Sequence, residues 1–319
     1  MKREFVLAGP EVDNLLGFLA VLGLLRALEK ERAPWQPRVY FDGIPLSARL
    51  VVREPVSEED VADAAAAGCA AYAPYFEFGQ HQDLNFEKAE ARRLLEAGRL
   101  NPTAASIMSA LFCDAAYRPD KDNQVDPTVL CAMFGQGHQH FLERLGSVSR
   151  GTVPRALAGK RAPDLNSSAY IGRALFQPWS RRDPTESFRW DFAEDRRYAT
   201  RAINPSNDAP TTEHGANRLA LLGLVCLQSA PVVQARRGVV VLATRAVSRG
   251  ADRQPRITWP IWDVPATLDA ILALLDEPEF AKDTPDFSAL RGVGVGQARR
   301  VVRLISGKFF NFSRAVALT

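Results

Sequence analysis

The sequence predicts an α+β protein, rich in helices, with small sheets and long irregular loops that carry arginine and aromatic residues. Three observations predict this class. The run from Leu15 to about Lys30 has apolar residues around most of its circumference when wound as a helix, which indicates a largely buried helix. Residues 239–244 form a β-branched run that predicts a strand. Residues 147–216 are rich in Pro, Asn, Ser, Arg and Asp, which is typical of loops.

The first half of the chain predicts a strand, the buried helix, a strand pair and further helices. A strand over residues 4–8 precedes the buried helix, and Asp13 or Asn14 caps that helix by accepting backbone N–H bonds. Gly17 and Gly23 each cost about 1 kcal/mol relative to alanine in a helix, so we expect another element to pack closely there. The other elements expected here are strands at 38–41 and 48–53, a helix that opens at 57 and contains the alanine run 64–67, and helices at about 86–97, 102–116 and 141–145.

The second half predicts a long loop-like stretch followed by mixed elements. Aromatic residues are interleaved in the stretch 147–216, which argues against full disorder because disordered segments are poor in aromatics. The elements expected here are one short helix within that stretch, a helix at about 217–227, strands at 239–244 and 257–262 with the second ended by Pro260 or Pro265, helices at 265–275 and 289–305, and an extended segment at 309–312.

Charge divides the chain of 319 residues into two unlike halves. Residues 1–149 hold 15 Lys and Arg against 21 Asp and Glu, whereas residues 150–319 hold 25 against 16, and 22 of those 25 are arginine. We therefore expect an acidic, helix-rich domain at 1–146 and a basic, mixed α/β domain at 147–319. An arginine-rich half favours a polyanionic partner, because guanidinium groups offer planar donors to phosphate oxygens. A bias toward arginine codons explains part of the same enrichment.

The sequence predicts a cytoplasmic protein without a membrane span. No secretory signal opens the chain, and the apolar run Leu15–Leu25 is shorter than the roughly 20 residues that cross a bilayer. Widely spaced cysteines favour buried reduced thiols over a disulfide framework. The cysteines are Cys69, Cys113, Cys131 and Cys226.

Familiar catalytic motifs are missing from the sequence. It has no Gly-X-Ser-X-Gly elbow and no Gly-X4-Gly-Lys-[Ser/Thr] phosphate loop, so neither a hydrolase nucleophile nor ATP binding is indicated. His138 and His140 form a His-X-His pair, but no Cys-X-X-Cys or His-Glu-X-X-His completes a set of metal ligands. We therefore expect a protein without catalytic residues, cofactor or metal.

Two stretches favour nucleic-acid binding, and the first spans residues 191–218. There, arginines suited to phosphates alternate with tyrosine and asparagine side chains that suit bases or sugars. The same residue types also fit an Arg/Asp/Asn lattice that pins an irregular loop. The candidate contacts are Arg196, Arg197, Tyr198, Arg201, Asn204, Asn207, Asn217 and Arg218.

The second stretch, from Gly292 to Gly296, fits the turn of a helix-hairpin-helix module. In such a module, backbone N–H groups at a helix N-terminus hold a phosphate. Arg299 and Arg300 would flank that phosphate. The glycines also fit a tight turn that binds nothing.

Separated blocks of the chain carry a resemblance to a known family. They are Gly9–Leu28, Trp190–Ala199 (Trp-Asp-Phe-Ala-Glu-Asp-Arg-Arg-Tyr-Ala), Gly215–Ala220, Trp259–Trp262 and Lys308–Phe312. Together they resemble proteins of type I-G (formerly I-U) CRISPR loci, both the large subunit of the interference complex and the extension family linked to its helicase-nuclease. The resemblance implies a non-catalytic component of an RNA-guided antiviral complex that holds guide RNA or target DNA.

We therefore expect a non-catalytic subunit of a type I CRISPR interference (Cascade-like) complex, with guide RNA or target DNA and other effector subunits as partners. Two alternatives stay open. One is a metal-dependent nuclease that uses Asp191, Glu194, Asp195 and His214. The other is a protein-only adaptor of the CRISPR helicase-nuclease, which would bind no nucleic acid.

Overall fold

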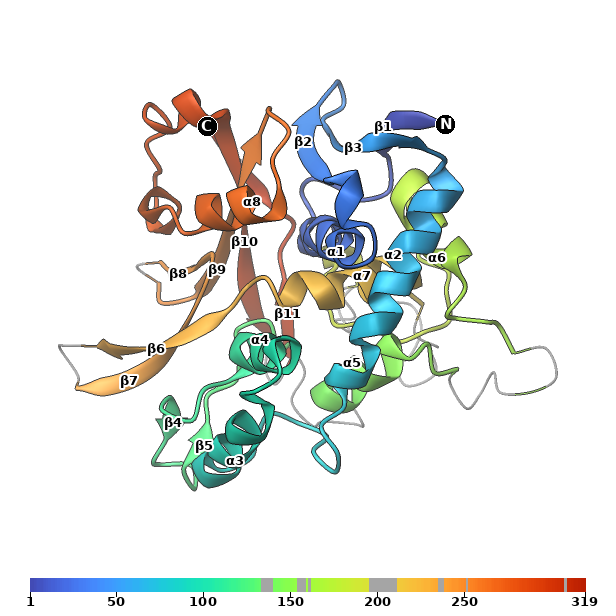
Figure 1. Ribbon diagram of the computed structural model, residues 1–319. Coiled ribbons are helices and arrows are strands. Elements are labelled where there is room, and N and C mark those ends of the chain that lie inside the picture. Colours follow the sequence, from blue (N-terminus) through green and yellow to red (C-terminus); the bar gives the residue numbers. More distant parts are fainter. Residues whose placement is uncertain are drawn as a thin grey trace.

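Helices and small antiparallel sheets share the structure, a computed structural model, which confirms the predicted α+β class (Figure 1). The structure describes residues 1–132, 140–153, 159, 162–194, 211–234, 238–250, 252–306 and 309–319. Two central helices are surrounded by further helices, with one small sheet at the N-terminus and a larger one at the C-terminus (Figure 1).

The centre of the molecule is the pair of helices α1 (Leu15–Glu31) and α7 (His214–Leu224). Nearly every residue of both helices is buried, as the apolar run predicted for α1. A Cβ atom at Gly23 would overlap the Leu219 carbonyl, and one at Gly223 would overlap the Leu19 carbonyl. The two backbones therefore approach more closely than any side chain permits, which confirms the reason expected for the glycine in α1.

Other helices cover this pair. Ser57 and Asp60 form the capping box that starts α2, and Gly68 of that helix lies against Ala27 of α1. The remaining helices are shorter than several of the predictions, because the ends depend on caps and tertiary contacts. They are α2 (Glu58–Tyr72), α3 (Lys88–Gly98), α4 (Pro102–Leu111), α5 (Phe141–Ser149), α6 (Ser168–Phe176) and α8 (Leu268–Leu275).

The N-terminal sheet has the order β1-β3-β2 and is antiparallel throughout. Its strands are β1 (Lys2–Leu7), β2 (Arg38–Asp42) and β3 (Ser47–Val56). The indole N–H of Trp262 donates to the Val39 carbonyl at 2.6 Å, and Val39 also bridges to Ala266. These contacts fasten the N-terminal sheet to the C-terminal part of the chain.

The C-terminal sheet has the order β11-β10-β9-β8, and β12 also pairs with β10. The strands are β8 (Val247–Arg249), β9 (Pro255–Trp262), β10 (Val295–Ser306), β11 (Phe309–Phe312) and β12 (Val316–Leu318). Trp259 of β9 stacks on Phe18 of α1 with ring centroids 4.9 Å apart, so one face of this sheet is turned toward the central helices.

Two predictions for this region are wrong. The helix expected over 289–305 is mostly strand β10, because long-range pairing with β9 satisfies its backbone and its Val-Val-Arg-Leu-Ile run suits a strand. Pro260 does not end β9 but lies inside it, opposite Ala298. Between α4 and α5, the chain forms a minimal hairpin of β4 (Tyr117–Arg118) and β5 (Gln124–Val125).

Strands β6 (Ser229–Gln234) and β7 (Val239–Thr244) form a separate two-stranded ribbon that projects from the body at the left of Figure 1. One continuous cluster of buried hydrophobic residues includes members from both sides of residue 146. The domain division expected there stays a prediction. None of the four cysteines, all of which the structure describes, forms a disulfide; three are buried and Cys113 is partly exposed. Among the described helices, none has the length and apolar character needed to cross a membrane.

Candidate nucleic-acid interface

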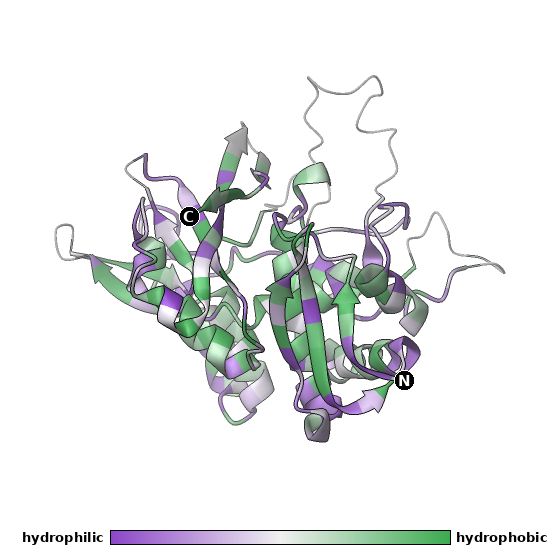
Figure 2. Cartoon of the chain, turned by 90° about the horizontal axis from the view of Figure 1, so that it is seen from above, coloured by the Kyte–Doolittle hydropathy of each residue, from purple (hydrophilic) through white to green (hydrophobic). Residues whose placement is uncertain are grey.

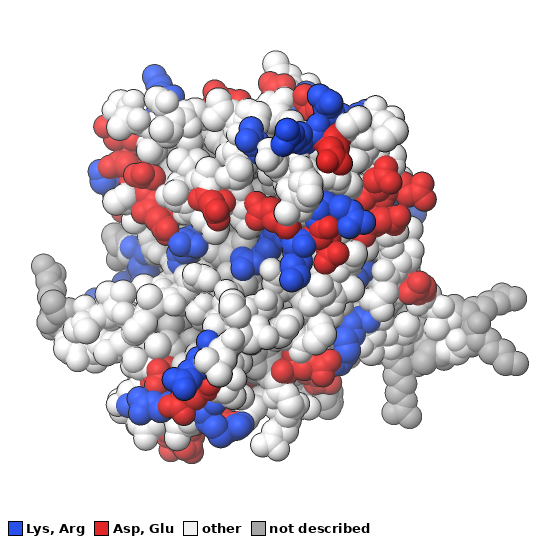
Figure 3. Space-filling model, viewed as in Figure 1, with Lys and Arg blue, Asp and Glu red and all other residues white. Residues whose placement is uncertain are grey.

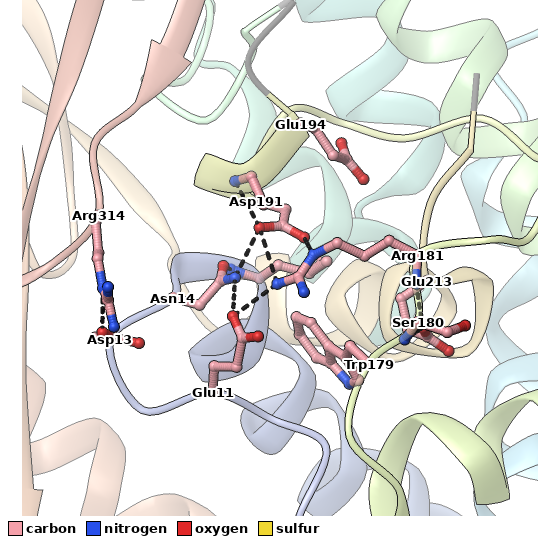
Figure 4. A network of polar contacts seen from close by, with 12 residues as sticks. Glu11, Asp13, Asn14, Trp179, Ser180, Arg181, Asp191, Glu194, Glu213 and Arg314 are labelled. Atoms are coloured by element: carbon pink, nitrogen blue, oxygen red, sulfur yellow. Dashed lines mark hydrogen bonds and ion pairs between the residues drawn. The ribbon is translucent and has the colours of Figure 1, made fainter. Parts of the chain in front are cut away.

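A polar network joins the start of α1 to the segment that leads into residues 195–210 (Figure 4). The buried Asp191 carboxylate accepts from Asn14 Nδ2 at 2.8 Å, from Arg181 Nε at 2.6 Å and from the Ala193 N–H at 2.9 Å. Arg181 also donates to Glu11 at 2.7 Å. One carboxylate therefore holds both the N-cap residue of α1 and the chain just before Glu194.

Glu213 fixes the other flank of the same segment. Its buried carboxylate accepts the backbone N–H groups of Ser180 at 3.1 Å and Arg181 at 3.2 Å. Asp183 accepts the backbone N–H of His214 at 2.9 Å, at the first residue of α7. Burial raises the pKa of the Glu213 carboxyl, and the two backbone donors oppose that rise.

Thr212 and Glu194 close the base of the segment. The Thr212 hydroxyl donates to the Glu194 carboxylate, and Asn217 Nδ2 donates to the Thr212 hydroxyl oxygen at 2.8 Å. Glu194 and Thr212, which flank the 195–210 segment, are therefore in direct contact. Six of the predicted nucleic-acid contacts fall between these ends and lie outside the described residues: Arg196, Arg197, Tyr198, Arg201, Asn204 and Asn207.

Asn217 and Arg218 do not lie on the surface. Each is 1% exposed, on the buried helix α7. Arg218 Nη1 donates to the carbonyl oxygens of Leu165 at 3.4 Å and Asn166 at 3.1 Å. Both side chains form hydrogen bonds inside the core, so the prediction that they contact nucleic acid is wrong. They fit the alternative, in which such residues pin an irregular loop.

The turn at Gly292–Gly296 is also corrected. No helix follows it, because β10 begins at Val295, so the helix N-terminus that would hold a phosphate is missing from this turn. Arg300 is 5% exposed and donates to the Thr258 hydroxyl oxygen at 2.9 Å and to the Asp283 carbonyl at 2.8 Å. Like Arg218, it anchors backbone carbonyls instead of facing solvent.

Three other guanidinium groups share one face of the C-terminal sheet. Strand pairing puts Val247, Ile257 and Val301 in one row across β8, β9 and β10. Because side chains alternate along a strand, Arg249 and Arg303, each two residues further on, point to the same side of the sheet. Arg299 lies on this side as well, opposite Trp259, so this is the side of the sheet that packs against α1. Arg299 and Arg303 are partly buried there, and Arg249 is exposed. We call Arg249, Arg299 and Arg303 the cationic face.

Arg303 is the best-defined member of the cationic face. Its Nη1 donates to the Val129 carbonyl at 3.2 Å, and its guanidinium carbon lies 4.7 Å from the centroid of the Phe310 ring. Its Nε is buried and has no hydrogen-bond partner. Burial, with repulsion from Arg249, lowers the pKa of Arg303 to about 10. Among the described residues, this cation therefore has no counter-ion in direct contact.

The other two members form no direct ion pair with a carboxylate among the described residues, although Asp13 acts on Arg299 and Asp126 acts on Arg249 through their charges. Arg299 donates to the Gln297 side chain at 2.8 Å, and burial lowers its pKa. Arg249 is exposed and donates to the Arg253 carbonyl at 3.3 Å. Nearby, Asp126 is already paired with Arg118 at 3.1 Å.

Many other arginines of the second half are neutralised. On the face seen in Figure 3, basic and acidic side chains are interspersed, with no continuous basic surface. Within the described residues, the cationic face therefore differs from these arginines because none of its members forms a direct ion pair. The paired arginines are Arg173 with Asp183, Arg181 with Asp191, Arg245 with Asp276, Arg256 with Asp283 and Arg314 with Asp13.

The residues considered for a nuclease do not assemble into a metal site within the part of the chain that the structure describes. No group of three or more His, Cys, Asp or Glu side chains there is placed to hold a metal ion. Asp191 is committed to Arg181 and Asn14, and Asp195 lies outside the described residues. Among the described residues, the His214 ring forms a hydrogen bond only through Nε2, which lies 3.0 Å from the Leu165 carbonyl oxygen. Burial lowers the pKa of His214 to about 4.

Comparison of the sequence with models of known protein families gives no match, and comparison with curated proteins gives none either. The site is therefore argued from its own geometry. Sequence reasoning missed Arg249 and Arg303. The signal was present, because a strand over 295–306 puts arginines 299 and 303 on one side, but a helical interpretation of the same residues concealed it.

Proposed function

We propose that this chain is a non-catalytic, nucleic-acid-binding subunit of an RNA-guided antiviral assembly of the type I-G kind. The observation that carries the proposal is the cationic face, where Arg249, Arg299 and Arg303 form no direct ion pair with a carboxylate among the described residues. The resemblance of the sequence blocks supplies the kind of assembly.

The chemistry of the cationic face suits a polynucleotide backbone. A guanidinium group that is partly buried without a counter-ion is costly, and a phosphate oxygen supplies both the charge and the acceptor that Arg303 lacks. Phe310, beneath that guanidinium, adds an aromatic ring of the kind on which unpaired bases stack. A single strand of RNA or DNA satisfies both features better than a duplex does.

Contacts between the C-terminal sheet and the start of α1 support the same proposal. Arg314, between β11 and β12, pairs with Asp13 at 2.5 Å, and the Ala315 N–H donates to the Asp13 carbonyl at 2.9 Å. Asp13 thus connects the C-terminal sheet to the network at the start of α1 (Figure 4). The arginines predicted from sequence at 196, 197 and 201 belong to a segment anchored beside that network, and we include them in the proposed interface.

Binding of labelled oligonucleotides tests the proposal. Fluorescence anisotropy with a single-stranded RNA, the matching single-stranded DNA and the duplex gives the dissociation constants of the purified chain. The variant Arg249→Ala/Arg299→Gln/Arg303→Gln is expected to bind about a hundredfold more weakly, since three charged hydrogen bonds of about 1 kcal/mol each are lost. The matched control, Arg32→Ala/Arg38→Ala/Arg53→Ala, removes three exposed arginines elsewhere.

Equal loss of affinity in both triple variants would show that only net charge matters and would contradict the cationic face as the site. A wild-type chain that binds none of the three oligonucleotides at low salt would contradict nucleic-acid binding itself. That second result would favour the protein-only adaptor.

A further inference from the structure

The ribbon of β6 and β7 exposes apolar side chains to solvent. Its described residues are Ser229–Gln234 and Val239–Thr244, and none of them is charged. Val232, Val233 and Val239 are 47%, 66% and 46% exposed. Figure 2 shows the ribbon as a hydrophobic projection at the left of the molecule. Two-stranded ribbons are marginally stable alone, so this one gains from further pairing.

Apolar side chains lie on both faces of the ribbon. Val232 and Val233 are neighbours in β6, so they point to opposite faces, and both are exposed. A ribbon packed on its own body would hide one face. The described residues therefore leave apolar side chains exposed on both faces, and such patches are typical of surfaces that contact another protein.

The two edges of the ribbon differ in what they offer to another strand. The Arg245 N–H donates to the Gln228 carbonyl at 2.9 Å, so Gln228 and Arg245 are a hydrogen-bonded pair. Hydrogen-bonded and non-hydrogen-bonded pairs then alternate along the two strands. Pro231 and Leu242 are then a non-hydrogen-bonded pair, so their backbone groups point outward. On β6 this outward position is a proline without an N–H group. On β7, Val240, Leu242 and Thr244 each present both an N–H and a C=O group outward.

We infer that β7 is a self-association edge, on which a second copy of this chain pairs antiparallel to give a four-stranded sheet in the order β6-β7-β7-β6. The strand, Val-Val-Val-Leu-Ala-Thr, has no charge to repel its own copy and no proline to interrupt the ladder. Antiparallel pairing of one edge with itself has two-fold symmetry, so association stops at a dimer. This inference does not depend on the proposed function.

A nucleic acid is a poor occupant for this edge. Backbone pairing along β7 requires another polypeptide, and the two strands themselves carry no charge; the hairpin's cations, Arg236 and Arg237, belong to the turn, outside the described residues. The uncharged edge therefore favours a protein strand, and self-complementarity favours the same strand from a second copy.

Sedimentation velocity of the full chain over about 1 to about 200 micromolar, after nuclease treatment, tests the inference, since dimer formation follows mass action. Wild type is expected to pass from monomer to dimer within this range. Val240→Pro removes an outward N–H and keeps the β6–β7 bonds, so it is expected to weaken the dimer at least about tenfold. Val233→Lys, the control on the far strand, adds a charge to the ribbon and is expected to change dimerisation much less.

Disulfide trapping gives an independent readout. Leu242→Cys is expected to form a cross-linked dimer under mild oxidation, whereas Arg53→Cys, exposed on β3, is expected to stay monomeric. A wild-type chain that remains monomeric at every concentration would overturn the inference. So would a dimer that Val240→Pro leaves unchanged, because that dimer would use another surface.

Discussion

At the scale of single residues, the Asp191 carboxylate holds the network at the start of α1 together. Its side chain is fully buried and is shared by Arg181, Asn14 and the Ala193 N–H. Asp191→Ala removes one of the two carboxylates that hold the partly buried Arg181, leaving Glu11, and takes the acceptor from Asn14 Nδ2 and the Ala193 N–H. We therefore expect the free energy of unfolding to fall by about 2–3 kcal/mol. Urea unfolding followed by circular dichroism measures this difference.

The matched control for Asp191 is Asp276→Ala. Asp276 also pairs with an arginine, Arg245, but its side chain is 54% exposed. Exposed pairs contribute about 0–1 kcal/mol, so this variant is expected to unfold near the wild-type midpoint. Similar losses in the two variants would show that the network at the start of α1 is not the structural anchor we describe.

His214 gives the protein a pH dependence of known sign. Burial, followed by repulsion from Arg218, lowers the pKa of His214 to about 4, whereas an unfolded histidine titrates near 6.5. Between these values the unfolded chain binds more protons, so stability is complete above about pH 6.5 and is lost as the pH falls toward 4. The loss from this residue approaches about 3 kcal/mol at the acidic end.

The variant His214→Gln isolates this contribution. Glutamine retains a donor for the Leu165 carbonyl but does not titrate. We expect the wild type to lose more stability than the variant between pH 7.5 and pH 5, measured by urea midpoints at the two pH values. Glu213, whose pKa is raised by burial, is present in both proteins and cancels in the comparison. Identical pH dependence in the two proteins would contradict the assignment.

Arg196 and Arg197 carry the prediction that comes from sequence alone. Their replacement by alanine is expected to weaken binding about equally for every oligonucleotide sequence, because phosphate contacts carry no sequence information. The slope of log affinity against log salt should become shallower by about 0.7 per lost contact on a single strand. Unchanged affinity and slope would remove these residues from the interface.

At the scale of elements, the close approach of α1 and α7 makes Gly23 and Gly223 sensitive positions. An alanine at either would overlap a backbone carbonyl of the facing helix. Gly23→Ala or Gly223→Ala is therefore expected to destabilise by about 3 kcal/mol or more, although alanine favours a helix by about 1 kcal/mol. Thermal unfolding measures the loss.

Gly146 in α5 provides the control for these glycines. The nearest atom to a Cβ placed there is the Phe76 carbonyl oxygen at 3.5 Å, which is ordinary contact. Gly146→Ala is expected to leave stability unchanged or to raise it slightly. If all three alanine variants were equally stable, the backbone contact between α1 and α7 would not be the feature that fixes the core.

Local signals in the sequence predicted the elements that depend on them. The start of α1 followed from its cap and apolar run, and the strand at 239–244 from its β-branched residues. Strand β10 was mistaken for a helix, because its identity depends on pairing with β9, which lies more than thirty positions earlier. The same error hid Arg303, whose place on the sheet follows only from the strand register.

At the scale of the whole molecule, net charge was a weaker guide than pairing. The arginine excess of the second half was visible in the sequence, but which arginines remain without a direct ion pair depends on carboxylates brought from afar. Glu11 reaches Arg181 across 170 positions, and Asp13 reaches Arg314 across 301. Arg218 and Arg300 were predicted to contact nucleic acid, but both are buried. Of the cationic face, the sequence indicated Arg299, whereas Arg249 and Arg303 required the strand register.

The central claim is that a polynucleotide lies on the C-terminal sheet, and ultraviolet cross-linking locates it most directly. A uridine-rich RNA is cross-linked to the purified chain, and the attached peptides are identified by mass spectrometry. We predict cross-links in the peptides that contain Arg249, Arg303 and Phe310, with loss of these cross-links in the triple variant of the cationic face. Cross-links confined to residues 1–132, or the same pattern in the variant, would contradict the claim.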